Sequence, residues 1–237
     1  MLKFMIALSS VLLFQNFASA QMQITEENSE SMISYYATEF ARIVNLVQLE
    51  RDISYPIGGT PVSDACLSLM NKDQILGKVG ESVFKELTKN TDSYTTLMEG
   101  GSLKKYCRKY PTMNNNQRAL VWVLVLTTMA HFESSCSDKA KAKGPNGTAY
   151  GYFQLHKGKE NMYVSNKRSC AKNSSGNAVL ASRCTLDMLD KQMERSSGEL
   201  FYSKSYWEVL RPQGPADKAK HIARAVSNSS LCNPMTL

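Results

Sequence analysis

Apolar side chains recur every three or four residues along several segments of the chain, which is the spacing of amphipathic helices. The pattern is present over residues 28–55, 73–90, 185–193 and 219–226. The prolines and glycines of YPIGGTP, residues 55–61, end the first of these segments. The sequence shows neither an internal repeat nor a strand-rich pattern. The chain is therefore predicted to be mainly α-helical.

A longer and almost unbroken apolar run extends from Ala119 to Ala130 and contains Trp122. A helix that is apolar on all sides lies inside a protein core. The valines of the run also permit a buried strand, but its length favours a helix. We therefore predict a core helix that ends near Glu133, the first acidic residue after the run.

Residues 1–20 have the pattern of a secretory signal peptide. Lys3 precedes an apolar stretch, and the small residues Ala18, Ser19 and Ala20 form the predicted cleavage site. The apolar stretch is too short for a retained membrane helix, which needs about 20 apolar residues. We predict that the protein is exported, to the periplasm or outside the cell, without stable membrane insertion.

The chain contains six cysteines, all of which follow the predicted signal peptide. An even number of cysteines in an exported chain is typical of disulfide bonds. Several pairings are compatible with the sequence. The expected bridges are Cys66–Cys107, Cys170–Cys184 and Cys136–Cys232. The first two are expected because each would close a loop within one region of the chain.

The formal net charge of +7 indicates an anionic partner for an exported protein. Teichoic acids, the stem carboxylates of peptidoglycan, acidic lipids and nucleic acid all fit this charge, so it narrows the class of partner only. Lys141 and Lys143 in the polar segment 137–148 are a candidate binding patch, although a solvated loop is the simpler interpretation.

Glu133 has the position of a general acid. A carboxyl can protonate a leaving oxygen near neutral pH only if its pKa is raised above its usual value of about 4.3. At the C-terminal end of a core helix, the helix carbonyls and burial both disfavour the charged form. Ser134 can hydrogen-bond a carboxyl or a substrate hydroxyl, and the segment 137–148 can form a wall of a cleft. A solvent-facing glutamate at a helix end is the alternative.

The segment AYGYFQLH, residues 149–156, supplies side chains suited to sugar binding. Tyr150 and Tyr152 offer flat apolar faces, and the amide of Gln154 can both donate and accept hydrogen bonds. Gly151 lets another chain or a sugar approach the backbone closely. These residue types predict a carbohydrate-binding site next to the acid.

A Glu-Ser pair at the end of an apolar helix, followed by an Ala-x-Gly-x-x-Gln signature, resembles the lytic transglycosylase and goose-type lysozyme superfamily. The matching residues are Glu133, Ser134, Ala149, Gly151 and Gln154. The resemblance implies a mainly helical, lysozyme-like catalytic domain over residues 112–237. Extra N-terminal helices over residues 21–111 would pack on this domain, and disulfides would stabilise it.

The resemblance also implies an activity. The protein would be a peptidoglycan glycosidase, or muramidase, that cleaves the β-1,4 bond between N-acetylmuramic acid and N-acetylglucosamine with Glu133 as general acid. Either water attacks, as in a lysozyme, or the sugar's own 6-hydroxyl closes an anhydro ring, as in a lytic transglycosylase. We expect peptidoglycan glycan strands as the partner, no nucleic acid, a monomer, and neither a cofactor nor a metal.

A hydrolase normally uses a second carboxylate, about 5 Å from the acid for retention and about 6.5 to 9.5 Å for inversion. The sequence does not identify this group. The candidates are Asp138, Glu160, Asp187 and Asp190.

The chain departs from the superfamily pattern near its C-terminus. The superfamily carries an Ala-Tyr-Asn-Ala-Gly segment whose tyrosine reaches the catalytic glutamate, whereas residues 221–230 read HIARAVSNSS. Tyr202 or Tyr206 can replace that tyrosine, and Trp207 can stack on a sugar ring, although all three also fit a core. The residues before Gln154 differ from the Leu-Met that the superfamily often has. The sugar specificity is therefore expected to be altered.

The main alternative is a non-catalytic protein that binds peptidoglycan or a partner on a lysozyme-like scaffold. An acid at the end of the helix argues against it, since binding alone does not require one. His131 and Glu133 also form half of a zinc deaminase signature, but the chain has no Cys-x-x-Cys motif. A cysteine nucleophile with His156 or His221 as base competes with the expected disulfides.

Overall fold

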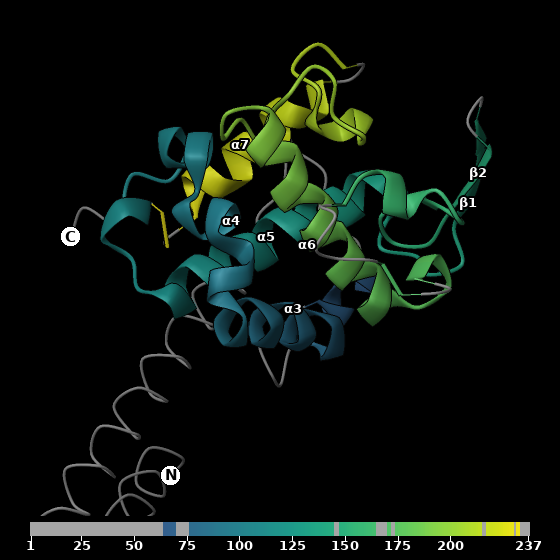
Figure 1. The fold of residues 1–237 in the computed structure, drawn as a ribbon, viewed down its shortest axis with the longest axis horizontal. Helices are drawn as coiled ribbons and strands as arrows, with labels where there is room; N and C mark the ends of the chain where they lie inside the picture. Colours follow the sequence, from purple (N-terminus) through teal and green to yellow (C-terminus); the bar gives the residue numbers. More distant parts are fainter. Residues whose placement is uncertain are drawn as a thin grey trace, which may run out of the picture. The chain divides into compact units, whose positions relative to one another are not determined.

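The structure, a computed structural model, describes residues 64–69, 76–144, 147–164, 170–171, 174–214, 217–229 and 231–232. The predicted signal peptide and the amphipathic helix expected over residues 28–55 lie outside these ranges. The described part of the chain is mainly helical, as the sequence predicts, and it includes one small antiparallel sheet (Figure 1).

Helix α5 (Asn115–Ser134) is the core helix that the sequence predicts. Asn114 caps it in a capping box, in which the Asn114 side chain accepts a hydrogen bond from the Gln117 N–H and the Gln117 side chain accepts one from the Asn114 N–H, each at 3.0 Å. Every residue from Ala119 to Ala130 is buried. The helix is thereby confirmed over the alternative of a buried strand.

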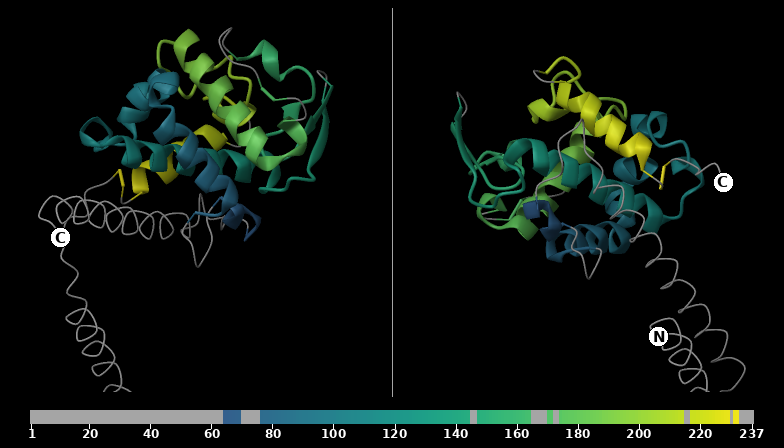
Figure 2. Two further views of the ribbon diagram at one scale, coloured as in Figure 1. Left: turned by 60° about the horizontal axis from the view of Figure 1, so that its bottom comes forward. Right: turned by 180° about the vertical axis from the view of Figure 1, so that it is seen from behind.

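The described residues form four further α-helices: α3 (Lys78–Lys89), α4 (Thr95–Glu99), α6 (Ala178–Arg195) and α7 (Lys218–Asn228). Helices α3, α4 and α7 contact α5, and α6 packs on α3 and α4 (Figures 1 and 2). The helices expected over residues 73–90 and 219–226 correspond to α3 and α7. This arrangement encloses the apolar surface of α5.

Helix α6 begins at Ala178, earlier than the start near Thr185 that the sequence suggests. The side-chain oxygen of Asn177 accepts hydrogen bonds from the N–H groups of Val179 (3.0 Å) and Leu180 (3.1 Å). Asn177 therefore caps the first turn. The apolar spacing misses this start because the first turn is only partly buried.

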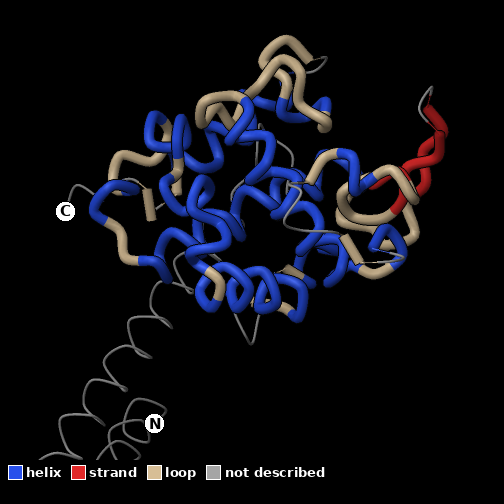
Figure 3. Tube along the Cα trace, viewed as in Figure 1, coloured by secondary structure: helices blue, strands red, loops and turns tan. Residues whose placement is uncertain are grey.

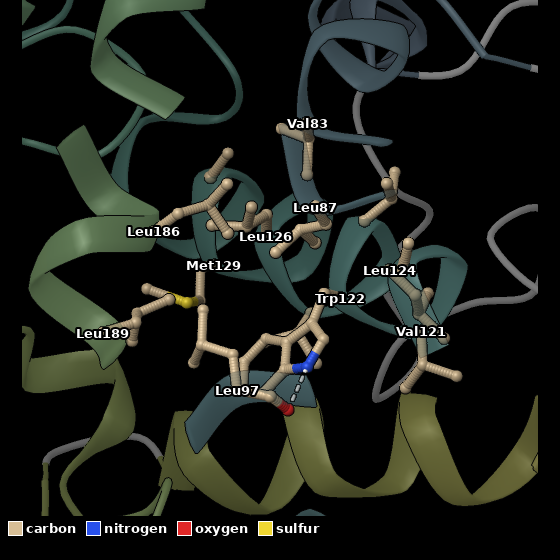
Figure 4. Packing of buried hydrophobic residues seen from close by; sticks show 14 of the residues in the cluster. Val83, Leu87, Leu97, Val121, Trp122, Leu124, Leu126, Met129, Leu186 and Leu189 are labelled. Atoms are coloured by element: carbon tan, nitrogen blue, oxygen red, sulfur yellow. Dashed lines mark hydrogen bonds between the residues drawn. The ribbon is translucent and has the colours of Figure 1, made fainter. Parts of the chain in front are cut away.

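The core joins residues on both sides of the boundary that the sequence suggests near residue 111. The indole nitrogen of Trp122 lies 2.8 Å from the Leu97 carbonyl oxygen and 3.0 Å from the Tyr110 hydroxyl oxygen (Figure 4). Apolar side chains of α3, α5 and α6 complete this part of the core: Val83, Leu87, Leu126, Met129, Leu186 and Leu189. The described residues before 111 thus share one core with the later helices.

The small sheet contains strands β1 (Lys141–Gly144), β2 (Gly147–Tyr150) and β3 (Leu155–His156), ordered β1-β2-β3 and antiparallel (Figure 3). The loop predicted over residues 137–148 is wrong where β1 pairs with β2. Strand β1 is exposed throughout, so it lacks the alternation that identifies a strand.

Three disulfides link Cys66 to Cys136, Cys107 to Cys232 and Cys170 to Cys184. The third pairing is the predicted one, and the other two predictions are wrong. Cys66 lies in the 3-10 helix η1 (Asp64–Ser68), which packs on α5 and so reaches Cys136 at the end of that helix. This long-range contact overrides the short loops that the sequence favours.

The three disulfides fit a protein of an oxidising compartment and are consistent with export. In the part of the chain that the structure describes, no helix has the length and apolar character needed to span a membrane.

Replacing Leu126 with alanine should lower the free energy of unfolding by about 2 to 5 kcal/mol, because its loss leaves a cavity in the core. The control is Met162→Ala, since Met162 is 68% exposed and should change stability by less than about 0.5 kcal/mol. Urea unfolding of the oxidised proteins, followed by circular dichroism, measures both values. Equal effects of the two substitutions would contradict the packing around α5.

Candidate active site

Glu133 lies in the last turn of α5, where the helix leaves the core, and its side chain is partly buried. The helix ends abruptly, because Ser135 (φ 50°) and Cys136 (φ 56°) both have left-handed backbone conformations. Such conformations are uncommon for residues other than glycine. Here the Ser135 N–H donates to the carbonyl oxygen of His131 at 2.9 Å, and Cys136 is bound to Cys66. These links fix the end of the helix and, with it, the position of Glu133.

Burial raises the pKa of Glu133 to about 7. The charge of Glu208 acts in the same direction. The charges of Lys218 and Arg211 and a backbone hydrogen bond from Val209 act in the opposite direction. The raised pKa that the sequence predicts here is confirmed, with burial as its largest cause. The carboxyl therefore keeps its proton in a large fraction of molecules near neutral pH.

The carboxylate whose charge reaches Glu133 belongs to Glu208, in the 3-10 helix η7 (Glu208–Leu210). Sequence reasoning missed Glu208, because only the packing of η7 on α5 brings it near. The sequence suggested four other residues as the second carboxylate. Of these, Asp138 is exposed, and Glu160 is buried, where its charge raises the pKa of Tyr206. Asp187 and Asp190 both lie on α6: Asp187 lines a pocket beside α3, and Asp190 accepts a hydrogen bond from the backbone of α4 at 3.2 Å.

Ser134 joins the end of α5 to the segment that carries the glutamine signature. Its hydroxyl oxygen lies 2.9 Å from the Tyr152 carbonyl oxygen and 3.1 Å from that of Ala130, so its single proton can serve either acceptor. The same oxygen accepts a hydrogen bond from the Ser137 N–H at 3.2 Å. The Ser134 hydroxyl is thus hydrogen-bonded to backbone groups of the protein. It positions the turn that contains Tyr152 against the helix of Glu133.

The turn over Gly151 and Gln154 lies against other parts of the chain. Gly151 has a φ of +69°, and a β-carbon there would lie 2.9 Å from the carbonyl oxygen of Ser175. The close approach predicted at Gly151 is therefore made by the backbone of the protein itself. The Gln154 side chain donates to the Gly151 carbonyl oxygen at 2.8 Å. Its own Oε1 is buried and has no hydrogen-bond partner among the described groups. Buried acceptors are nearly always paired, so Oε1 is an exception among the described groups.

Tyr206 connects this turn to the following aromatic segment. Its hydroxyl oxygen accepts a hydrogen bond from the His156 N–H at 2.9 Å and lies 2.7 Å from His156 Nδ1 and 3.1 Å from the Gln154 carbonyl oxygen. Burial raises the pKa of Tyr206, and the nearby charge of Glu133 contributes to that rise. The charge of Glu133 thus reaches Tyr206, and both candidate tyrosines, Tyr202 and Tyr206, line a pocket with residues of α6.

The other aromatic residues predicted to bind sugar differ in exposure. Tyr150 is partly exposed, and the ammonium of Lys141 lies 5.7 Å from its ring centroid. Tyr152 is buried, and its hydroxyl oxygen lies 2.7 Å from Ser68 Oγ. Trp207 is 2% exposed, and its indole N–H donates to a backbone carbonyl at 2.9 Å. Its ring belongs to the core, and the stacking role predicted for Trp207 does not fit this burial.

Together these groups provide acid–base chemistry. Glu133 can supply a proton, and Lys218 and Arg211 favour the carboxylate that remains after the proton has left. No group of histidine, cysteine, aspartate and glutamate side chains among the described residues could hold a metal ion.

No protein-family model matches the chain, and no curated protein matches it. Among solved structures, the chain is similar to wild-type form 2 of a protein called Bd0314 DslA, with a TM-score of 0.53 and 22% sequence identity. A variant of that protein in which glutamine replaces a glutamate gives a TM-score of 0.52 and 20% identity. Each match covers 65% of this chain and 90% of the other. The likeness concerns the fold alone.

The Glu133→Gln substitution should stabilise the protein at alkaline pH. The pKa of Glu133 is about 7 in the folded chain, against an ordinary value of about 4.3. Between these pH values the folded state holds a proton that the unfolded state has released, so the contribution of Glu133 to stability falls as the pH rises through this window. We expect Glu133→Gln to raise the free energy of unfolding by about 1 to 3 kcal/mol at pH 8 relative to its effect at pH 4.

Urea unfolding of wild type and Glu133→Gln at the two pH values measures this difference. Glu81→Gln, on the exposed face of α3, is the control for loss of a surface carboxylate. The same effect of Glu133→Gln at both pH values would show that the pKa of Glu133 is not raised.

Proposed function

We propose that the chain is an exported peptidoglycan glycosidase with a lysozyme-like domain and with Glu133 as its general acid. The observation that carries the proposal is the partly buried carboxyl at the end of α5, whose pKa burial raises to about 7. An acid with this pKa holds its proton near neutral pH and can release it to a leaving oxygen. The hydrogen bond between Ser134 and Tyr152 supports the class of enzyme, because it brings together the two halves of the motif that resembles the superfamily.

In the first step, Glu133 donates its proton to the oxygen of the β-1,4 bond, and the bond between that oxygen and C1 of N-acetylmuramic acid breaks. Positive charge develops at C1 in a transition state that resembles an oxocarbenium ion. Glu133 is left as a carboxylate, whose charge is favoured by Lys218, Arg211 and the Val209 hydrogen bond. These groups keep the pKa low enough for the proton to leave.

In the second step, Glu133 acts as a base. It takes a proton either from the sugar's own 6-hydroxyl, whose oxygen then closes a 1,6-anhydro ring, or from a water molecule that attacks C1. The first reaction needs no second carboxylate, whereas hydrolysis normally uses one. Glu208 is the candidate for that role, since its charge reaches Glu133.

Mass spectrometry of soluble products tests the proposed reaction. The oxidised protein is incubated with purified peptidoglycan, both normally acetylated and chemically de-N-acetylated. We expect soluble glycan fragments from at least one wall, with reducing ends if water attacks and anhydro ends if the 6-hydroxyl attacks. Glu133→Gln should lower the rate by about 100- to 10,000-fold, because it removes the acid.

The control Glu81→Gln should leave the rate unchanged, since Glu81 lies on α3 in an exposed ion pair with Lys85. The absence of products from both walls would contradict the enzymatic proposal and favour the non-catalytic binding protein.

The alkaline limb of the pH dependence of kcat/KM should follow the charges around Glu133. Because Lys218 lowers the pKa of Glu133, Lys218→Gln should move this limb to higher pH. Glu208→Gln should move it to lower pH, because the charge of Glu208 raises the pKa.

Lys220→Gln is the matched control on the same helix, because Lys220 is exposed and pairs with Asp217 at 3.0 Å. An alkaline limb that does not move in Lys218→Gln would argue against Glu133 as the titrating acid.

A further inference from the structure

A pocket of about 220 Å³ adjoins the candidate active site at Tyr206. Its walls come from α6, from Tyr163 and from the aromatic segment that precedes η7. The residues that decide its chemistry are three basic side chains and three tyrosines: Lys191, Arg195, Lys204, Tyr163, Tyr202 and Tyr206. It is separate from the pocket beside α3 and α6, which contains Glu86 and Asp187.

The charge of this pocket is positive. No carboxylate is among the described residues that line it. Lys191 is already neutralised by Glu194, whose carboxylate oxygen lies 2.7 Å from the Lys191 Nζ. Arg195 and Lys204 are exposed and form no ion pair with any residue that the structure describes. Two positive charges therefore remain for a ligand.

The tyrosines make one wall of the pocket rigid. The rings of Tyr163 and Tyr206 meet edge to face, with centroids 4.7 Å apart, and the ring of Tyr206 also contacts that of Trp207 in the core. The Tyr206 hydroxyl is held by His156 and the Gln154 backbone. Tyr206 thus lines this pocket and is also close enough to Glu133 for the charge of Glu133 to affect its pKa.

We propose that this pocket binds a carboxylate that the glycan strand carries close to the bond that Glu133 cleaves, with Arg195 and Lys204 as its cationic partners. The proposal rests on the proposed function, because it assumes that the strand lies at Glu133. A guanidinium pairs with a carboxylate through two parallel hydrogen bonds, and a lysine ammonium adds a second charge. The pocket would thereby bind the anionic substituent of the strand, while Glu133 cleaves the bond between its sugars.

Peptidoglycan offers such a carboxylate from two sources. In an intact wall the stem peptide carries it, since the lactyl group of N-acetylmuramic acid is joined to the peptide as an amide. In a strand from which the peptide has been removed, the lactyl group itself is a free carboxylate. Both have the chemistry that the pocket would recognise.

The experiment compares the wild-type chain with the double variant Arg195→Gln/Lys204→Gln on three substrates. These are the intact wall, the same wall with its carboxylates converted to amides, and the wall freed of stem peptides by an amidase. The control variant Lys85→Gln/Lys89→Gln removes the same charge from exposed positions on α3. Initial cleavage rates at low substrate give kcat/KM, and sedimentation with the wall gives binding in proteins that also carry Glu133→Gln.

We expect the Arg195/Lys204 variant to lose about three- to tenfold in binding and in kcat/KM on a wall with free carboxylates, as the removal of two exposed ion pairs allows. On the amidated wall the difference from wild type should shrink to that of the control. A loss confined to the intact wall would identify the stem peptide as the source, and a loss confined to the peptide-free strand would identify the lactyl group.

A loss of the same size on the free and amidated walls, or in the control variant, would overturn the proposal, because the effect would then not depend on a carboxylate in this pocket. Binding that depends on Arg195, Lys204 and the carboxylates, without cleavage by wild type, would support the pocket and contradict the proposed enzymatic function. The absence of both binding and cleavage would overturn both.

Discussion

The burial of α5 from Ala119 to Ala130 is the constraint on which the rest of the structure depends. A helix that is apolar on every side is stable only if other elements cover all of its faces. Any uncovered face would leave apolar surface in contact with water, which is unfavourable. Helices α3, α4 and α7 and the short helices η1 and η7 provide this cover. The same requirement places Glu133 at the edge of the core, since the helix passes from apolar to polar residues within one turn. The catalytic candidate is therefore a consequence of where the buried helix ends.

The abrupt end of α5 brings strained backbone and fixed contacts together. Ser135, Cys136 and Gln154 have positive φ values although none of them is glycine. Such conformations are unfavourable, and they persist where the surrounding structure determines them and often where a function requires them. Here the Cys66 bridge holds the helix end to η1, and the Ser134 hydroxyl holds it against the glutamine turn at the Tyr152 carbonyl. Two segments about twenty residues apart in sequence are thereby joined in one rigid unit.

The electrostatics of Glu133 balance two opposing effects. Burial disfavours the carboxylate, while Lys218, Arg211 and the backbone of Val209 favour it, and the resulting pKa is about 7. A fully enclosed acid would keep its proton too firmly, and a solvated one would lose it below neutral pH. The groups that oppose burial come from η7 and from α7 and the residues before it, far from α5 in the sequence. The same segment carries Tyr206, which also borders the basic pocket of Arg195 and Lys204.

The sequence by itself determined the features that depend on neighbouring residues. The apolar run from Ala119 predicted α5, spacing predicted α3 and α7, and the position of Glu133 predicted the direction of its pKa. It also predicted the bridge between Cys170 and Cys184, which closes a short loop. In each case the physical cause, such as helix periodicity or the end of an apolar run, lies within a few turns of chain.

Only the tertiary structure decided the features that depend on distant segments. The exposed hairpin of β1 and β2 has no apolar alternation, so local patterns did not reveal it. The packing of η1 on α5 chose Cys136 as the partner of Cys66, and the packing of η7 on α5 made Glu208 the carboxylate near Glu133. The local sequence around Trp207 fits either a ring that faces a sugar or a ring in the core. The tertiary structure buries it in the core. Contacts of this kind arise from how whole elements cover one another's apolar surfaces, which the order of residues in any single segment does not contain.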